Sequence, residues 1–441
     1  MDPHQAMIFE RRKFMSAQNS AFEKALQVGR PPNIVKLFPH SRALLVSGKV
    51  IDRAMLGKGK AMTIAANGRN AFIIRGALMA AQRANAAVII EIAKSEGGRN
   101  AYCAVNYWNI ARQVDGACNE LGITIPVAVH ADHYGIKGDK DLEEAKIEIP
   151  TMIEAGITSI AIDASHLPDD RNLLANIAVH PFLPTWCGYE TEVGEIKGKH
   201  GLSTVEEALF LIQGLNAHRI FPDWIALNNG TTHGIEASDA GIQVELTRDI
   251  HNALAKYKIS GAQHGTSGNS SERLRRIAQE TRTTKANVAT ALQMITWGVK
   301  VNEYGNALLD EKGDFVKVSD QGVTDELWAE MVNYGKSKNL KAGDYKKLNL
   351  PFENKLHALP RNIRERMGKG VEEFVYELLT GVFHAGDTAP IAVDAILKAG
   401  SYDLGPKTER IEDPGLWSEE KIRERASKME TDKGPKGDFD D

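Results

Sequence analysis

The segment VAVHADHYG carries the residues best suited to chemistry, because its apolar run ends in His130, Asp132 and His133. This spacing can present a neutral imidazole to a metal ion and a carboxylate to a substrate. His233 and His264 follow two later apolar runs. Three such histidines would leave coordination positions open for substrate, as in catalytic zinc sites. Any one of them taken alone is more often a hydrogen-bonded structural residue.

A loop of small residues, GAQHGTSGNS, follows the apolar run that ends in His264. Backbone amides freed by Gly265 and Gly268, together with the Ser267 hydroxyl and the start of the next helix, would form a cradle for an anion. An ordinary strand-to-helix turn with an N-cap is the alternative interpretation. Gly230 and Gly234 surround His233 in ALNNGTTHG, as expected where backbone approaches a ligand closely.

The segment GYETEVGEIKG places Glu190 and Glu192 two residues apart, and therefore on the same face of a strand. Carboxylates that point into a barrel are unfavourable unless they bind a cation or exchange protons. A solvated outer face is an equally good interpretation of these two residues alone. Other polar residues also end apolar runs: Asn67, Asp163, Asn228, Asn229 and Asn302.

These residues need a scaffold that brings strand ends together, and short apolar runs alternate with amphipathic stretches from Ala61 onward. Eight runs are predicted strands: 61–67, 86–92, 124–130, 158–163, 189–193, 224–229, 259–264 and 297–302. The alternation predicts repeated βα units and a parallel sheet. Eight strands favour an α/β fold of the (β/α)8 TIM barrel type over an open doubly wound sheet, and catalytic residues of such barrels lie at the carboxyl ends of the strands.

The 441 residues divide into an N-terminal helical leader (1–60), the barrel (61–306) and a C-terminal helical extension that packs on the barrel (307–441). We expect the last ~20 residues, which are highly charged, to be disordered. A net charge of −4 gives no electrostatic case for nucleic-acid binding. Three cysteines without a metal-binding spacing favour a reducing cytoplasm. The first residues lack the apolar core of a secretory signal, and no apolar run is long enough to predict membrane insertion.

Seven segments in order resemble the motifs of the zinc-dependent class II ketose-bisphosphate aldolases: AMTIAANGR, VAVHADHYG, SIAIDASH, ETEVG, NNGTTHG, AQHGTSG and GVKVN. Together they cover most of residues 61–302. The resemblance implies reversible cleavage of a ketose bisphosphate, above all fructose 1,6-bisphosphate, into dihydroxyacetone phosphate and glyceraldehyde 3-phosphate. It also implies a homodimer or homotetramer. Tagatose bisphosphate or another ketose, a metal-dependent barrel hydrolase and a non-catalytic binding barrel are the alternatives.

The resemblance also implies roles for individual residues. It implies that catalytic Zn2+ is held by His133, His233 and His264. Glu192 and Asp163, with His130, resemble an alternative metal position. Asp132 would act on the oxygen of the cleaved bond, and Glu195 is the candidate acid/base in the loop after Glu192. The implied phosphate cradle, which a monovalent cation (Na+ or K+) often accompanies, consists of Gly234, Gly265 and Ser267. Asn302 would steady the enediolate, with Asn67 near the same half of the substrate.

The sequence departs from the family where the resemblance predicts an Asn-x-Asp-Thr/Ser-Asp run after strand eight. At that point it reads Asn302-Glu303-Tyr304-Gly305-Asn306, without the acidic and hydroxyl groups that contact the aldehyde half. We therefore expect altered aldehyde recognition. Tyr304, Arg361 and Arg364 are candidates for the aldehyde side or for a subunit interface.

Overall fold

Eight parallel strands form a closed barrel in chain order in the computed structural model, which describes residues 20–99, 101–194, 201–230, 241–302 and 305–429. The strands are β1 (Thr63–Asn67), β2 (Val88–Ala93), β3 (Val127–Gly135), β4 (Ser159–Asp163), β5 (Gly188–Val193), β6 (Trp224–Leu227), β7 (Ser260–Gln263) and β8 (Thr283–Val288). Almost every strand residue is buried, because helices cover the outer face and side chains fill the interior. The predicted TIM barrel is confirmed.

The predicted eighth strand at 297–302 is wrong. Trp297 ends a helix, and residues 299–301 make only isolated antiparallel bridges, such as Val299 with Lys317. The true β8 lies in a stretch that the apolar spacing predicts to be helical. Its Lys285 and Asn287 side chains are buried inside the barrel, so the strand lacks the apolar run that marks most of the others. Because its interior side chains are polar, β8 could not be predicted from the pattern of apolar residues.

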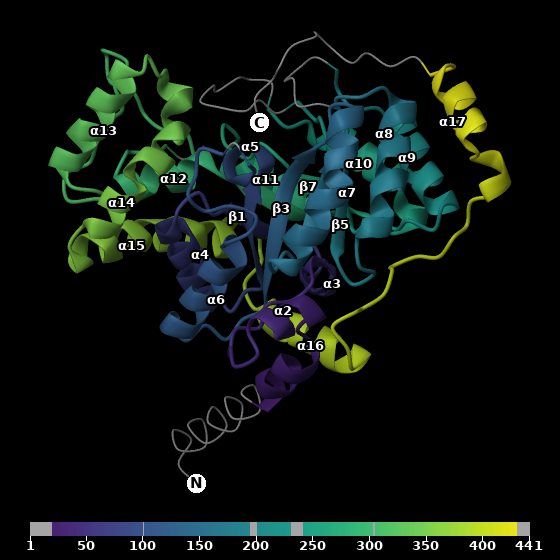
Figure 1. The fold of residues 1–441 in the computed structure, drawn as a ribbon, viewed down its shortest axis with the longest axis horizontal. Coiled ribbons are helices and arrows are strands. Elements are labelled where there is room, and N and C mark those ends of the chain that lie inside the picture. The colour runs from purple at the N-terminus through teal and green to yellow at the C-terminus, as the bar shows by residue number, and fades with distance from the viewer. Residues whose placement is uncertain (1–19, 100, 195–200, 231–240, 303–304, 430–441) are drawn as a thin grey trace.

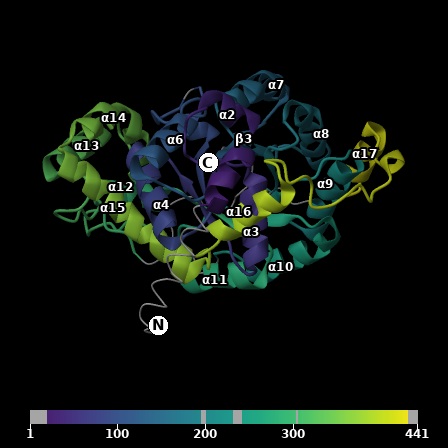
Figure 2. The ribbon, with the colours of Figure 1, turned by 90° about the horizontal axis from the view of Figure 1, so that it is seen from below.

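Helices surround the barrel and close its amino end (Figures 1 and 2). Those up to β8 are α2 (Pro32–Leu37), α3 (Gly48–Lys58), α4 (Ala71–Ala84), α5 (Lys94–Gly97), α6 (Ile110–Leu121), α7 (Asp139–Glu154), α8 (Asp169–Val179), α9 (Val205–Ala217), α10 (Val244–Ala253) and α11 (Ser271–Glu280). After β8 come α12 (Thr290–Trp297), α13 (Asp325–Ser337), η3 (Ala342–Leu348), α14 (Asn349–Ala358), α15 (Arg361–Glu377), η4 (Leu378–Val382), α16 (Ala389–Ala399) and α17 (Glu419–Ala426). Short 3-10 turns lie at His180–Phe182, Ala255–Tyr257 and Pro414–Leu416.

Helix α3 covers the amino end of the barrel, where it contacts β2, β3, β5 and β8. A side chain at Gly48 would meet Oγ of Ser159 at 2.4 Å, so the first residue of the helix must be small. Asp52 on α3 accepts a hydrogen bond from Thr284 of β8 at 2.7 Å and pairs with Lys407 at 2.7 Å. These contacts attach the N-terminal and C-terminal segments to the barrel floor. The candidate catalytic residues lie at the opposite end of the barrel, at the carboxyl ends of the strands.

The eighth position in the ring of helices is filled by α15, which packs against α4 and α12 (Figure 1). The approach to α4 is close: a side chain at Gly76 would meet the backbone oxygen of Gly368 at 2.5 Å. Residues 298–302 and 305–360 form an excursion between α12 and α15, and its Trp328 and Tyr345 share a small core with Trp297 of α12. The division of the chain at residues 60 and 306 stays a prediction, as does a disordered C-terminus.

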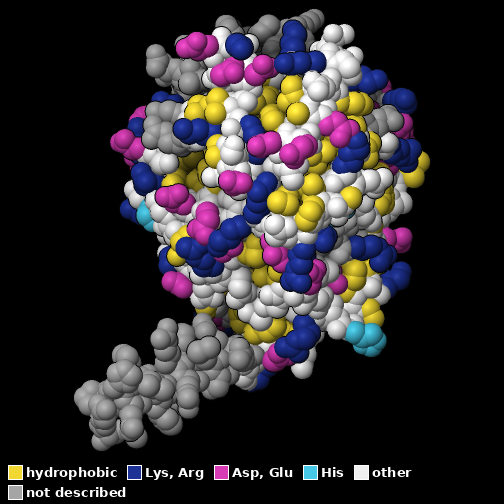
Figure 3. All heavy atoms as spheres, turned by 90° about the vertical axis from the view of Figure 1, so that its left-hand side faces the viewer, with side chains coloured by type: hydrophobic (Ala, Val, Ile, Leu, Met, Phe, Trp, Pro, Cys, Tyr) yellow, Lys and Arg dark blue, Asp and Glu magenta, His cyan; other side chains and the backbone are white. Residues whose placement is uncertain are grey.

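Charge is distributed evenly on the face that carries this excursion. Lys and Arg side chains alternate there with Asp and Glu and gather into no single basic patch (Figure 3). Within the described part of the chain, no helix combines the length and the apolar character needed to cross a bilayer.

Candidate active site

The carboxyl ends of the strands bring together a buried cluster of titratable side chains. Its members come from five strands and the residue after β7: Glu91, His130, Asp132, His133, Asp163, Glu190, Glu192, His264 and Lys285. Six of the residues to which the resemblance gives a role are in this cluster: His130, Asp132, His133, His264, Glu192 and Asp163. His233, Gly234 and Glu195 lie outside the described residues, so their roles remain predictions.

The rings of His133 and His264 meet edge to face, with 4.3 Å between their centroids. Nδ1 of His133 lies 3.2 Å from Oε1 of Glu192 and 3.5 Å from Oδ2 of Asp163. Nε2 of His264 lies 2.8 Å from Oε1 of Glu190, whereas its buried Nδ1 has no hydrogen-bond partner among the described residues. Oε2 of Glu192 lies 3.6 Å from this Nδ1. A buried nitrogen without a hydrogen bond is unfavourable in a folded protein, so this atom is suited to bind a ligand.

Local backbone irregularity places these groups. The pairing of β3 with β4 shifts register between Ala131 and Tyr134, and His133 has a φ of 42°. A bulge turns a side chain toward a new direction, and left-handed backbone at a residue other than glycine is held only by its surroundings. The shift allows neighbouring Asp132 and His133 both to reach the interior of the barrel end.

The cluster fits a divalent metal ion. Ligand atoms of Asp132, His133 and His264 lie within 4.8 Å of one another, as do those of His133, Asp163 and Glu192. Histidine nitrogen with carboxylate oxygen is a donor set suited to zinc, and Nδ1 of His264, which makes no hydrogen bond to the described residues, is the kind of atom such an ion would bind. His130 differs from His264 in that both of its ring nitrogens have polar contacts. Ser159 contacts its Nδ1 at 2.9 Å, and Lys285 contacts its Nε2 at 3.0 Å.

Asp132 is held as an anion by its neighbours. Its Oδ1 accepts a hydrogen bond from Nδ2 of Asn287 at 2.9 Å and lies 3.4 Å from Nζ of Lys285. Burial alone would raise the pKa of this carboxyl, but His133 and Lys285 hold it well below its usual range. The side chain is therefore an ionised base beside the candidate metal ligands.

Lys285 is the central cation of the cluster and was missed by the sequence analysis. Its ammonium group lies 2.8 Å from Glu190 and 3.4 Å from Glu91. These carboxylates raise the pKa of Lys285 against the opposing effect of burial. In turn, despite its burial, Lys285 lowers the pKa of Glu190 to about 2, with help from His264. The sequence left open whether Glu190 and Glu192 face the barrel interior or solvent. In the structure both lie in the interior.

Glu91 and Glu192 are the carboxylates that the cluster compensates least. Burial and then the charge of Asp132 raise the pKa of Glu91. Burial and then the charge of Asp163 raise the pKa of Glu192. A cation bound between Glu192 and Asp163 would remove this repulsion, so the pair fits the alternative metal position that the resemblance implies.

A cavity of about 400 Å3 opens onto the cluster. Gly265 and Ser267, two predicted cradle residues, line it next to His264. Gly265 and Gly268 have φ values of 60° and 87°, which glycine adopts readily. Ser270 caps α11 by accepting a hydrogen bond from Arg273 at 3.2 Å. The loop is thus a capped turn whose first residues face the cavity; the phosphate role stays a prediction.

Asn302 is not at the end of β8, because the strand itself was misplaced. Its Oδ1 accepts a hydrogen bond from the backbone of Asn306 at 3.0 Å, and it does not line the cavity. Asn287 occupies the strand-eight position and contacts Asp132. The run that begins at the end of β8 is therefore Asn287-Val288-Ala289-Thr290-Ala291, which keeps the asparagine and threonine of the family pattern and replaces both aspartates with alanine.

The other end of the cavity is formed by groups that the sequence analysis only partly identified. Asn67 ends β1, Arg69 follows it, Glu96 lies in α5 after β2, and Gln293 belongs to α12. Lys341 and the residues after it in η3 supply the outer wall. The excursion after the barrel therefore contributes directly to the site.

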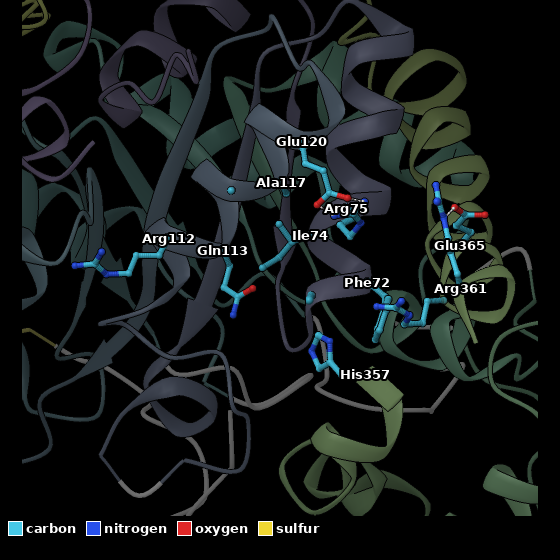
Figure 4. A pocket seen from close by; sticks show the side chains of 13 residues that line it. Phe72, Ile74, Arg75, Arg112, Gln113, Ala117, Glu120, His357, Arg361 and Glu365 are labelled. Atoms are coloured by element: carbon cyan, nitrogen blue, oxygen red, sulfur yellow. Dashed lines mark hydrogen bonds and ion pairs between the residues drawn. The ribbon is translucent and has the colours of Figure 1, made fainter. Parts of the chain in front are cut away.

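A second cavity, of about 600 Å3, lies between α4, α6 and the start of α15, away from the metal cluster (Figure 4). Arg361 and Arg364 line it and do not line the cavity beside the titratable cluster; their place on the aldehyde side or at a subunit interface stays a prediction. Figure 4 shows Arg75 beside Glu120, which it contacts at 2.7 Å. Tyr304 lies outside the described residues.

Comparisons with known proteins agree with this geometry. The sequence model of the class-II fructose-bisphosphate aldolases matches residues 49–339. A fructose-bisphosphate aldolase of Streptococcus pneumoniae is 30% identical over 232 residues, covering 49% of this chain and 69% of the relative. That of Staphylococcus aureus (strain Mu50) is 35% identical over 123 residues, which are 28% of this chain and only 38% of the relative.

Solved structures show the same fold. The YdjI aldolase from Escherichia coli K12 has a TM-score of 0.52 at 17% identity, covering 78% of this chain and 99% of that one. Fructose-bisphosphate aldolase from Campylobacter jejuni has a TM-score of 0.53 at 17% identity, covering 78% and 97%. With the family match spanning most of the chain and the cluster of histidines and carboxylates in the barrel mouth, the chain belongs to the class-II fructose-bisphosphate aldolase family.

Proposed function

We propose that this protein catalyses the reversible cleavage of a ketose bisphosphate, fructose 1,6-bisphosphate first among them, into dihydroxyacetone phosphate and glyceraldehyde 3-phosphate. The observation that carries the proposal is the buried Nδ1 of His264, which makes no hydrogen bond to the described residues and lies in a cluster with Asp132 and His133. Family membership supplies the reaction type.

The proposed metal is Zn2+, held by His133, His264 and His233. When bound, it would supply Lewis-acid stabilisation of negative charge on the ketone oxygen. Glu192 and Asp163 offer the alternative position, where their mutual repulsion favours a cation.

Asp132 is the proposed base for the hydroxyl on C4. The hydrogen bond from Asn287 and the nearby charge of Lys285 occupy Oδ1, which leaves Oδ2 as the oxygen for proton transfer. A base that is ionised and already oriented needs no rearrangement when the C3–C4 bond breaks. In the reverse direction the same carboxyl returns the proton to the alkoxide, and Glu195 is the proposed group that exchanges the proton on dihydroxyacetone phosphate.

The proposed phosphate cradle is formed by Gly265, Ser267 and Gly234, with Na+ or K+ as a companion ion. Gly265 and Ser267 line the cavity on the β7 side, where phosphate sites of these barrels are common. The proposal extends to a homodimer or homotetramer in the cytoplasm, for which sedimentation of the purified protein and cell fractionation are the tests.

The decisive experiment is an assay of the metal-replete protein with fructose 1,6-bisphosphate, tagatose bisphosphate and ketose 1-phosphates. Release of dihydroxyacetone phosphate that is abolished by a chelator and restored by Zn2+ is the expected result. If the protein releases dihydroxyacetone phosphate from none of these substrates, the proposal is wrong. Chelator-sensitive hydrolysis of an ester or amide in its place would favour a barrel hydrolase.

A further inference from the structure

Two buried side-chain amides on one side of the active-site cavity each have an atom that makes no hydrogen bond to the described residues, an acceptor in one and a donor in the other. Both Asn67 and Gln293 line the cavity and are almost fully buried. Oδ1 of Asn67 and Nε2 of Gln293 have no hydrogen-bond partner among the described residues. One is an acceptor and the other a donor, and each is unfavourable while it stays unpaired.

The orientation of Gln293 follows from a chain of hydrogen bonds. Oδ1 of Asn70 accepts from the backbone at Phe72, 3.1 Å away, so its amide nitrogen donates to Oδ1 of Asn349 at 3.3 Å. Asn349 must then donate to Oε1 of Gln293, at 2.7 Å. Arg69, which can only donate, contacts the same oxygen at 3.3 Å. The nitrogen of Gln293 is therefore the end of the amide left without a partner.

The orientation of Asn67 is fixed in the same way. Its amide nitrogen donates to Oε2 of Glu96 at 2.5 Å, and a carboxylate can only accept. The other oxygen of Glu96 accepts from Nε of Arg69 at 2.7 Å. Asn67, Glu96, Arg69 and Gln293 thus form one buried chain along the cavity wall, and its two unsatisfied atoms are a fixed acceptor and a fixed donor.

We propose that Gln293 and Asn67 bind a hydroxyl group of the substrate, which donates to Oδ1 of Asn67 and accepts from Nε2 of Gln293. A hydroxyl is the simplest substrate group that can do both at once. The inference rests on the proposed function and deepens it, because it assigns Gln293 as a residue that determines specificity.

The position of the pair identifies which hydroxyl this is. The cradle residues follow β7, and Asp132, the proposed base for the C4 hydroxyl, lies on β3. Strand β2 pairs with β3 at Ala93 and Asp132, and β1 pairs with β2 at Asn67. Carbons beyond C4 that extend toward β2 and β1 reach the pair, so the hydroxyl is on C5, next to the carbonyl of the released aldehyde. Asn67 would then contact the aldehyde half, not the enediolate half that the resemblance implies.

The test compares two aldehydes that differ only in this hydroxyl. Condensation with dihydroxyacetone phosphate is measured for glyceraldehyde 3-phosphate and for freshly prepared 3-oxopropyl phosphate, which has hydrogen in place of the hydroxyl. The variant Gln293→Glu keeps an oxygen for Arg69 and Asn349 and replaces the donor that faces the cavity. We expect the ratio of kcat/KM for the two aldehydes to fall at least about tenfold in the variant, since a buried polar site discriminates strongly against a missing hydroxyl.

Comparing ratios between proteins cancels the different intrinsic reactivity of the aldehydes. Gln293→Met, which removes the donor without adding charge, is the second variant and should reduce the ratio in the same direction. Gln279→Glu, on the outer face of α11, is the matched control and should leave the ratio as in the wild type. A folded Gln293→Glu protein with the wild-type ratio would overturn the inference.

Failure of the proposed function has a different signature. The exchange of the C3 proton of dihydroxyacetone phosphate with solvent needs no aldehyde, and it is measured on the metal-replete wild type. Exchange together with an unchanged aldehyde ratio overturns only the hydroxyl assignment, whereas absence of exchange overturns the aldolase proposal itself.

Discussion

Nζ of Lys285 lies 2.8 Å from Oε2 of Glu190, and neither side chain has any exposed surface. The same ammonium group faces Glu91 and Asp132, each at 3.4 Å. One cation thus compensates several carboxylates in the barrel interior. Removing a single partner from such a network leaves uncompensated buried charge, which destabilises more than the pair itself stabilises.

Lys285→Met is therefore expected to lower the free energy of unfolding by about 3–5 kcal/mol. Urea denaturation of the metal-free protein measures this. Lys398→Met is the matched control: Lys398 pairs with Asp394 on the surface and is 77% exposed, so its loss should change stability by less than about 1 kcal/mol. A double variant, Lys285→Met with Glu190→Gln, should recover part of the loss. Equal effects of the two single lysine variants would contradict the network.

Asp132→Asn should reduce kcat by about 10²- to 10⁴-fold, the range for loss of a general base. The amide keeps the shape of the side chain but cannot take the proton of the C4 hydroxyl. Steady-state cleavage kinetics give kcat, and metal analysis of the same sample shows whether zinc is retained. Asp394→Asn, on the exposed face of α16, is the control. A kcat within tenfold of wild type would assign the base to another residue.

Removal of the metal should abolish cleavage and lower the thermal midpoint, since a ligand that binds only the folded state stabilises it. His264→Ala should bind less than a tenth of the zinc held by the wild type, because a ligand from the buried cluster is lost. Plasma emission spectroscopy after dialysis gives the zinc content. His384→Ala, which alters a histidine that contacts Gln279 outside the cluster, should keep full occupancy. Equal zinc in both variants would exclude His264 as a ligand.

His251 should make stability depend on pH in the acid range. Burial, and next the charge of Arg282, lowers the pKa of this histidine from 6.5 to about 3 in the folded protein. As the pH falls below 6.5, His251 binds a proton in the unfolded chain but not in the folded chain. The free energy of unfolding therefore decreases as the pH falls through this window and rises with increasing pH. The contribution is complete above pH 6.5 and is lost as the pH falls toward 3.

The variant His251→Gln tests the direction of this pH dependence of stability. Its amide oxygen can accept the hydrogen bond that the backbone of Arg282 donates to Nδ1 at 3.2 Å. Unfolding free energies from urea titrations at several pH values should fall less steeply for the variant than for the wild type between pH 6.5 and 4. Parallel curves would contradict the lowered pKa. The difference between the two proteins isolates His251 from the carboxylates that titrate in the same range.

Seven of the eight strands could be predicted from the sequence, most of them because their residues are largely apolar, as in a parallel sheet covered by helices. The eighth could not, because Lys285 and Asn287 place polar groups inside the barrel. That error moved the expected asparagine from Asn287 to Asn302. The available signal was the β-branched pair Thr283 and Thr284 after the helix that ends at Glu280.

The metal cluster was predictable to the extent that its residues end strands. His133, His264, Asp132 and Glu192 all follow or close apolar runs, and parallel strands bring such ends together. Arg69, Glu96 and Gln293 could not be identified, because a charged pair and an amide within helical or loop segments are indistinguishable from surface residues until their burial is known. Lys341 reaches the cavity only through the fold of the excursion.

The use of α15 as the eighth helix of the ring affects how the chain folds. Helix α4 is made early in synthesis, yet the surface that covers it belongs to residues 361–377. Until those residues leave the ribosome, the small and apolar flank of α4 at Gly76 faces water. Contacts between such distant segments slow folding and expose nascent chains to aggregation. Completion of this barrel therefore waits until α15 has been made, and a chain that stops before α15 should depend on chaperones to stay soluble.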